Sequence, residues 1–275
     1  MCYSEDEDMI YMASGYYPYL FRYSLSESKW DIPTSWGTDN RWCFSSAGKG
    51  EIYLGGYGYF YRYDINSNTL NRLRDCYNDL SVYRDEWDPA LVYSSGGNCL
   101  YGTRGRSRDN FMKYSISSGT WSFLSSLPAN FGSGHKLTVF SDGSVFAMRG
   151  DNTTQFWHYN PTLNQWTSKA AVPAGVYFGS SLLYPGKGNY LYATTGYGSA
   201  GFYRYSADSN VWEDLADVPV LLGQNNWDVS YGGTCLAYPG KGDYIYLVQG
   251  APTYTYGTCN FFRYSISNDT WEEIA

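Results

Sequence analysis

The chain has 275 residues, of which 16% are charged, and its formal net charge is −7. A nucleic-acid-binding surface is basic, so this charge balance argues against DNA or RNA as a partner. No run of apolar residues is long enough to cross a bilayer, so we expect no insertion into a membrane.

A short aromatic and basic motif recurs six times along the chain. In each copy a large residue, a basic residue and a tyrosine stand together, and a tryptophan follows seven residues later. The second copy alone departs, because Leu70 stands where tryptophan is expected. An interval of about 40 to 60 residues is typical of repeats in which each unit is one four-stranded blade. The tyrosine and tryptophan positions are Tyr23 and Trp30, Tyr63 and Leu70, Tyr114 and Trp121, Tyr159 and Trp166, Tyr205 and Trp212, and Tyr264 and Trp271.

Each repeat predicts four short strands, which we name A to D from the N-terminal side. Alternating apolar residues bounded by Gly, Asn, Ser and Pro indicate such strands and their turns. The fifth repeat is the clearest, and its strands are expected at 180–184, 190–196, 202–206 and 211–215. Strand B of the other repeats is expected at 9–12, 51–54, 99–101, 145–148 and 244–247.

Together the repeats predict an all-β fold, a six-bladed β-propeller of four-stranded antiparallel blades. We expect one domain over residues 1–275, because no linker or change of composition interrupts the series. The first repeat has only residues 1–3 for strand A and the last ends in strand D, so each blade should use consecutive strands. The clipped start and abrupt end favour a domain cut from a longer protein, or a mature chain. The blades are expected at about 1–40, 41–87, 88–135, 136–179, 180–232 and 233–275.

The repeats resemble those of the kelch family, whose blades carry glycines after strand B, a tyrosine in strand C and a tryptophan in strand D. The double glycine is intact only at Gly55 and Gly56 in the second blade, and Leu70 replaces one tryptophan. The resemblance implies the propeller fold but leaves function open, since the family includes adaptors, glycan binders, oxidases and epimerases. The matching elements are Gly55, Gly56 and Tyr63, then Gly196, Tyr205 and Trp212, then Gly250, Tyr264 and Trp271.

Binding residues are expected at the end of the propeller that carries the B–C loops and the D–A connections. These loops vary in length and content, whereas the A–B and C–D turns are monotonous. Variable loops on a rigid scaffold commonly carry binding residues, and tyrosine, tryptophan and arginine suit recognition surfaces. The candidates are Tyr83, Arg84, Trp87, Asp88, Arg104, Arg106, Arg108, Arg149, Trp227, Asp228, Tyr254 and Tyr256.

Several other patterns favour a structural interpretation. The Gly-Lys-Gly segments, as in 186–188 and 240–242, lack the strand and helix context of a phosphate loop and predict hairpin turns. The basic residue of strand C recurs in every blade, which favours a framework role. The Arg104, Arg106 and Arg108 cluster is not periodic, so it is either a solvated loop or a contact for an anion.

Catalytic and metal-binding motifs are sparse. The two histidines, His135 and His158, show no metal-ligand spacing, and no GxSxG segment supports a nucleophile. We therefore expect no cofactor, no metal site and no enzyme activity. The six cysteines permit disulfides but do not specify a pairing, and packing of Cys43 and Cys235 at the same repeat position is the alternative.

The favoured function is a non-catalytic recognition or scaffold propeller that binds a protein or a glycan through its variable loop face. One alternative is a structural component of a cell-surface or filamentous assembly. The other is a carbohydrate-active enzyme resembling the kelch-like sialic acid epimerases. Low lysine content, abundant Tyr, Ser, Gly and Asn, and possible disulfides favour an extracellular or cell-surface location, with the cytoplasm as the alternative.

Overall fold

Six four-stranded antiparallel sheets make up the described part of the chain, which confirms the predicted all-β six-bladed β-propeller. The packing of the Cα trace divides the chain into two compact units. Unit 1 comprises Met1–Phe131, Asp142–Val145 and Tyr159–Trp166, and unit 2 comprises Gly132–Ser141, Phe146–His158 and Thr167–Ala275. The computed structural model describes residues 2–4, 8–13, 19–35, 43–56, 59–76, 80, 90–105, 108–223, 234–249 and 260–274.

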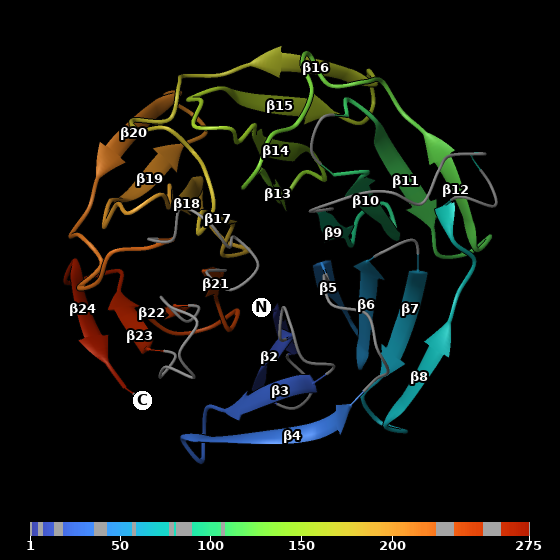
Figure 1. Ribbon diagram of the computed structural model, residues 1–275, viewed down its shortest axis with the longest axis horizontal. Helices are drawn as coiled ribbons and strands as arrows, with labels where there is room; N and C mark the ends of the chain where they lie inside the picture. The colour runs from blue at the N-terminus through green and yellow to red at the C-terminus, as the bar shows by residue number, and fades with distance from the viewer. Residues whose placement is uncertain are drawn as a thin grey trace. The chain divides into compact units, whose positions relative to one another are not determined.

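Each blade uses four strands that are consecutive in the chain, as predicted. Within every sheet the strands lie side by side in chain order (Figure 1). Blade 1 holds β1 (Cys2–Ser4), β2 (Met9–Ala13), β3 (Tyr19–Ser24) and β4 (Lys29–Ser35). Blade 2 holds β5 (Cys43–Gly48), β6 (Glu51–Gly56), β7 (Tyr59–Asp64) and β8 (Thr69–Arg72). Blade 3 holds β9 (Leu91–Ser94), β10 (Cys99–Thr103), β11 (Phe111–Ser115) and β12 (Thr120–Phe123).

The remaining three blades follow the same scheme. Blade 4 holds β13 (Lys136–Val139), β14 (Val145–Met148), β15 (Phe156–Asn160) and β16 (Gln165–Ser168). Blade 5 holds β17 (Ser181–Leu183), β18 (Tyr190–Thr194), β19 (Phe202–Ser206) and β20 (Val211–Asp214). Blade 6 holds β21 (Cys235–Ala237), β22 (Tyr244–Val248), β23 (Phe261–Ser265) and β24 (Thr270–Glu273).

The repeated tyrosine and tryptophan lie opposite each other on strands C and D of one blade. In blade 5, Tyr205 and Trp212 are register partners, and their ring centroids are 5.1 Å apart. In blade 2 the partner of Tyr63 is Leu70. The motif is therefore a framework of the blade. The other pairs, at 5.1 or 5.2 Å, are Tyr23 with Trp30, Tyr114 with Trp121, Tyr159 with Trp166, and Tyr264 with Trp271.

A buried phenylalanine near the start of strand C ties one blade to the next. Phe202 of blade 5 meets Tyr264 and Trp271 of blade 6 edge to face, with ring centroids 4.8 Å and 5.0 Å apart. This geometry adds about 0.5–1.5 kcal/mol per aromatic pair beyond the burial of area. The same contact is made by Phe60 with Tyr114 and Trp121, Phe111 with Tyr159 and Trp166, and Phe156 with Tyr205 and Trp212.

Two side chains of one blade also bind both backbone polar groups of a residue in the preceding blade. The Ala170 amide donates to Asn210 Oδ1 at 2.9 Å, and Trp212 Nε1 donates to the Ala170 carbonyl at 3.0 Å. We call this arrangement the clasp. It supplies partners to backbone groups that sit beyond the hydrogen-bonded ladder of strand D. It recurs at Ser125 with Asn164 and Trp166, and at Ala216 with Asp269 and Trp271.

Four cysteines with described side chains form no disulfide. They are Cys43, Cys76, Cys99 and Cys235. Cys43 donates to the Gly55 carbonyl at 3.2 Å, and burial raises the pKa of the Cys99 thiol. These four residues therefore act as packing groups, while the side chains of Cys2 and Cys259 lie outside the described residues.

Candidate functional site

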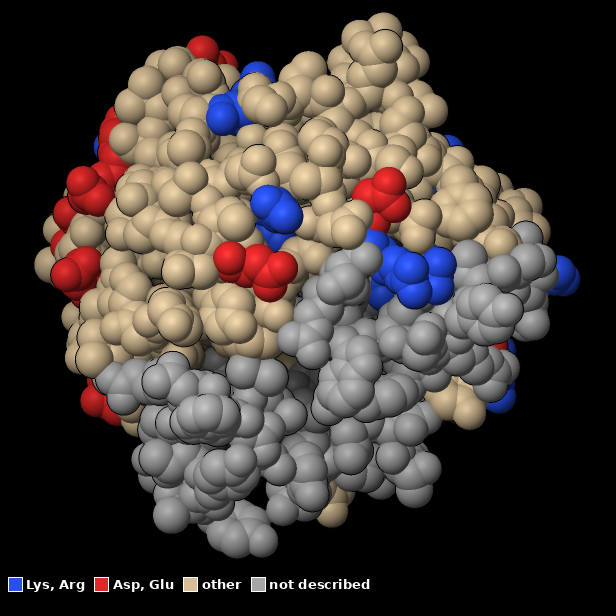
Figure 2. Space-filling view, turned by 45° about the horizontal axis from the view of Figure 1, so that its top comes forward, with Lys and Arg blue, Asp and Glu red and all other residues tan. Residues whose placement is uncertain are grey.

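Charged side chains are few, and several pair within their own blade. Figure 2 shows the described acidic and basic residues of one face in small groups among mostly uncharged residues. The strand-C arginines face acidic register partners on strand D, which gives them the framework role that their periodicity predicted. Such half-exposed pairs each contribute only about 0–1 kcal/mol, so they organise the blade surface without dominating its stability. The pairs are Arg22 with Asp31 at 2.7 Å, Arg204 with Glu213 at 2.6 Å, and Arg263 with Glu272 at 2.7 Å.

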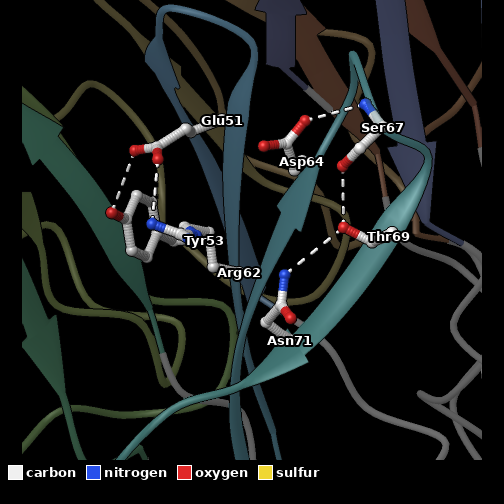
Figure 3. Close-up of polar contacts among 7 residues, drawn as sticks. All are labelled: Glu51, Tyr53, Arg62, Asp64, Ser67, Thr69 and Asn71. Atoms are coloured by element: carbon white, nitrogen blue, oxygen red, sulfur yellow. Dashed lines mark hydrogen bonds and ion pairs between the residues drawn. The ribbon is translucent and has the colours of Figure 1, made fainter.

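Blade 2 departs from this pairing because Asn71 stands opposite Arg62. Arg62 Nη1 instead contacts Glu51 Oε1 at 3.1 Å, and the Tyr53 hydroxyl donates to Glu51 Oε2 at 3.1 Å (Figure 3). Burial raises the pKa of Tyr53, so its phenol stays protonated and remains a donor. This trio is a framework cluster on β6 and β7, in which Glu51 receives both contacts.

The Gly-Lys-Gly segments form the A–B turns that the sequence predicted. The Tyr184 hydroxyl donates to the Gly188 carbonyl at 3.1 Å, and the Tyr238 hydroxyl donates to the Gly242 carbonyl at 2.8 Å. Lys187 links the two turns, because its Nζ donates to the Gly242 carbonyl and lies 4.9 Å from the centroid of the Tyr238 ring. The A–B turns of blades 5 and 6 are therefore held by their own side chains.

Three predicted binding residues lie in the described chain, and two of them close their own B–C loops. Arg104, in unit 1, is 8% exposed and donates to Asn110 Oδ1 at 3.3 Å. Arg149, in unit 2, occupies the matching place after strand B and donates to Gln155 Oε1 at 2.6 Å. Arg108, in unit 1, is exposed. Their part in binding stays a prediction.

The other predicted binding residues are not placed by the structure. Most of them stand on the two longest D–A connections, which the sequence had favoured. Those that lie outside the described residues are Tyr83, Arg84, Trp87, Asp88, Arg106, Trp227, Asp228, Tyr254 and Tyr256.

Neither histidine belongs to a metal-binding cluster in the described chain. His135 is buried, and its Nδ1 donates to the Gly132 carbonyl at 3.0 Å. The His158 ring packs on the Phe146 ring, with ring centroids 4.7 Å apart. Among the described residues, no group of three His, Cys, Asp or Glu side chains is arranged to hold a metal ion. The same residues include no helix long and apolar enough to span a membrane.

Unit 2 presents an aromatic patch on the B–C and D–A loops that the sequence did not single out. Tyr197, in the B–C loop of blade 5, is 53% exposed, and its ring meets half-buried Tyr177 edge to face at 5.0 Å. Leu221, in the D–A connection of blade 5, is 47% exposed. Its segment lies beside Tyr197, because the Gly198 amide donates to the Leu222 carbonyl at 2.6 Å. We call Tyr177, Tyr197 and Leu221 the tyrosine platform.

Tyr197 adopts a left-handed backbone conformation with φ of 57°. A bulky residue rarely takes this conformation, which is retained where the surroundings enforce it. Here the Tyr197 amide donates to the Phe178 carbonyl at 2.9 Å, and the Tyr177 amide donates to the Thr195 carbonyl at 3.0 Å. The loop therefore fixes an exposed tyrosine in an unfavourable conformation. The flanking glycines, Gly196 and Gly198, were the signal available in the sequence.

Comparison with models of known protein families gives no match for this chain. Comparison with curated protein sequences also gives no match.

Proposed function

We propose that this chain is a non-catalytic recognition propeller that binds a protein or glycan ligand through its B–C and D–A loops. The observation that carries the proposal is the exposed ring of Tyr197, fixed at positive φ against Tyr177. Local strain that the surroundings maintain is concentrated at ligand-binding and switch regions. A rigid aromatic provides contact area at a small entropic cost on binding.

We also infer that the blades are kelch-like. Support comes from the glycine after strand B, as at Gly196, and from the opposed Tyr205 and Trp212 on strands C and D. A scaffold of this kind holds variable loops in fixed positions, which suits recognition. An extracellular or cell-surface location is part of the same proposal.

The proposal is tested by comparing two tyrosine variants in ligand capture. Tyr197→Gly removes the platform ring and suits the positive φ. Tyr190→Ala is the matched control, because Tyr190 is 37% exposed at the opposite, A–B end of the same strand β18. Immobilised proteins are presented to a glycan array and to extracts of the source cells. We expect Tyr197→Gly alone to lose ligands; equal capture by both variants contradicts the proposal.

A further inference from the structure

We propose that the tyrosine platform binds a neutral glycan, with the apolar face of one sugar ring stacked on Tyr197. This inference rests on the proposed recognition function and specifies its ligand class. A sugar ring combines an apolar C–H face with hydroxyl groups at its edge. Tyrosine has the matching character, an apolar ring with a polar tip.

Just over half of the Tyr197 side chain, 53%, is exposed. Gly198 follows it in the chain, and a Cβ atom built on Gly198 would meet no atom of the described residues, its two chain neighbours aside, within 4 Å. The Tyr177 ring approaches Tyr197 at an interplanar angle of 77°, so it supports one side of the ring through an edge contact. A flat ligand therefore has access to the remaining surface of Tyr197.

The platform is also fixed before a ligand arrives. The Gly198 amide is bonded to the Leu222 carbonyl, and the Leu221 carbonyl accepts a hydrogen bond from Gln249 Nε2 at 2.9 Å. Gln249 is itself held by Asn260 Nδ2 at 2.9 Å. Preorganised loops lose little conformational freedom on binding, which a small ligand contact requires.

The charge of the platform segments favours a neutral ligand. No Lys, Arg, Asp or Glu occurs in residues 170–186 or 188–203, and Asp217 is the only charged residue in 215–223. Recognition of a phosphate, sulfate or carboxylate typically uses arginine or lysine, and recognition of a basic peptide uses carboxylates. The platform segments offer neither in number. The adjoining loop of blade 4, which pairs with Val176 through Thr153, adds Arg149 and Asp151, and these bind Gln155 and the Ser133 amide. Uncharged hydroxyl and backbone groups suit the hydroxyl groups of a sugar.

The size of the platform favours a sugar over a folded protein. A stable protein interface covers about 800 Å² on each partner, whereas one aromatic side chain supplies about 150–250 Å². Two tyrosines and one leucine thus match one or two sugar rings. A protein that docks here would need most of its contact elsewhere.

Titration calorimetry with neutral hexasaccharides tests the inference. The probes are maltohexaose, cellohexaose, xylohexaose and mannohexaose, with heparin and oligogalacturonate as acidic comparators. We expect one neutral probe or more to bind, and Tyr197→Gly to weaken that binding at least about fivefold. Tyr190→Ala should leave it unchanged. The affinity should not fall with added salt, because no charges are paired.

Three results overturn the inference: no neutral probe binds, only the acidic probes bind, or Tyr197→Gly binds as the unaltered chain does. Thermal melting of each variant confirms that the protein is folded. A purified protein ligand that is lost in Tyr197→Gly while no hexasaccharide binds overturns the glycan inference and leaves the recognition proposal standing. If a ligand binds Tyr197→Gly as tightly as the unaltered chain, both the glycan inference and the recognition proposal are overturned.

Discussion

Asn210 of blade 5 accepts a hydrogen bond from Ala170 of the preceding blade, whose amide donates to Asn210 Oδ1 at 2.9 Å. The same oxygen accepts the Tyr205 hydroxyl at 2.7 Å, so one carboxamide joins a strand of its own blade to the preceding blade. Asn210 has a φ of 56°, a conformation that asparagine tolerates better than most residues. The clasp thus depends on a residue type that fits both the turn and the acceptor role.

Removing the acceptor of one clasp should destabilise unit 2. Asn210→Gly keeps the positive φ but leaves the Ala170 amide and the Tyr205 hydroxyl without this partner. We expect a loss of about 1–3 kcal/mol in the free energy of unfolding, measured by urea denaturation. Asn210→Asp, which retains the oxygen and copies Asp269 of blade 6, should lose less. Equal losses in both variants would show that the oxygen is not what matters.

Completing the clasp of blade 3 should stabilise unit 1. Gly119 stands where blades 4 and 5 have asparagine, while Trp121 Nε1 already donates to the Arg74 carbonyl at 3.2 Å. The Tyr114 hydroxyl lies 3.7 Å from a Cβ built on Gly119, so an added carboxamide is near its donor. Gly119→Asn should raise the free energy of unfolding by about 1 kcal/mol in chemical denaturation. Gly119→Ala should lower it, because φ is +67°.

The Asp243 carboxylate should make unit 2 sensitive to acid. Its pKa is lowered by hydrogen bonds from the Ser265 and Ser267 hydroxyls, at 2.6 Å and 2.9 Å, and from the Ser267 amide. A carboxylate whose pKa is lowered by folding stabilises the protein at pH values above its unfolded pKa of about 4. This stabilisation is lost as the pH falls through the pKa of the folded state. Asp243→Asn should therefore be less stable than the unaltered chain at neutral pH. Urea denaturation across the acid range should show the difference closing, and a constant difference contradicts this assignment.

Tyr205 should contribute to unfolding at alkaline pH. Burial raises its pKa to about 12, above the value of about 10 in an unfolded chain. Its stabilising effect is complete below about pH 10 and is lost as the pH rises through about 12. Tyr205→Phe should be less stable at neutral pH, with a gap that narrows above about pH 10. Denaturant titrations followed by tryptophan fluorescence measure this difference in the free energy of unfolding. A difference that widens above about pH 10 would contradict the raised pKa of Tyr205 as its cause.

The repeat motif predicted the blades because its residues pair inside one blade. Tyr205 and Trp212 face each other across β19 and β20, so their spacing in the chain reports a local hairpin. The contacts between blades could not be predicted from the sequence in the same way. Phe202 meets Trp271 and Asn210 meets Ala170 over long separations in the chain, and no periodicity indicates which residues of two repeats touch.

The loop sites were harder to predict than the blades. The sequence drew attention to long loops rich in Trp and Arg, most of which lie outside the described residues, and to Arg104, which is nearly buried. Tyr197 was not among the predicted residues, because the flanking Gly196 and Gly198 alone do not show that the residue between them takes a positive φ. That property comes from hydrogen bonds to Phe178 and Leu222, which only the folded chain brings near.

Because each clasp joins a blade only to its predecessor, resistance to mechanical tension should vary along the chain. Blades 4, 5 and 6 each form hydrogen bonds to the preceding blade through both a side-chain oxygen acceptor and an indole, as at Asn164 and Trp166. Blade 2 has Leu70 in place of the indole, and blade 3 has Gly119 in place of the oxygen. When the chain is stretched, blades 2 and 3 should therefore separate from their preceding blades at a lower force than blades 4, 5 and 6 do.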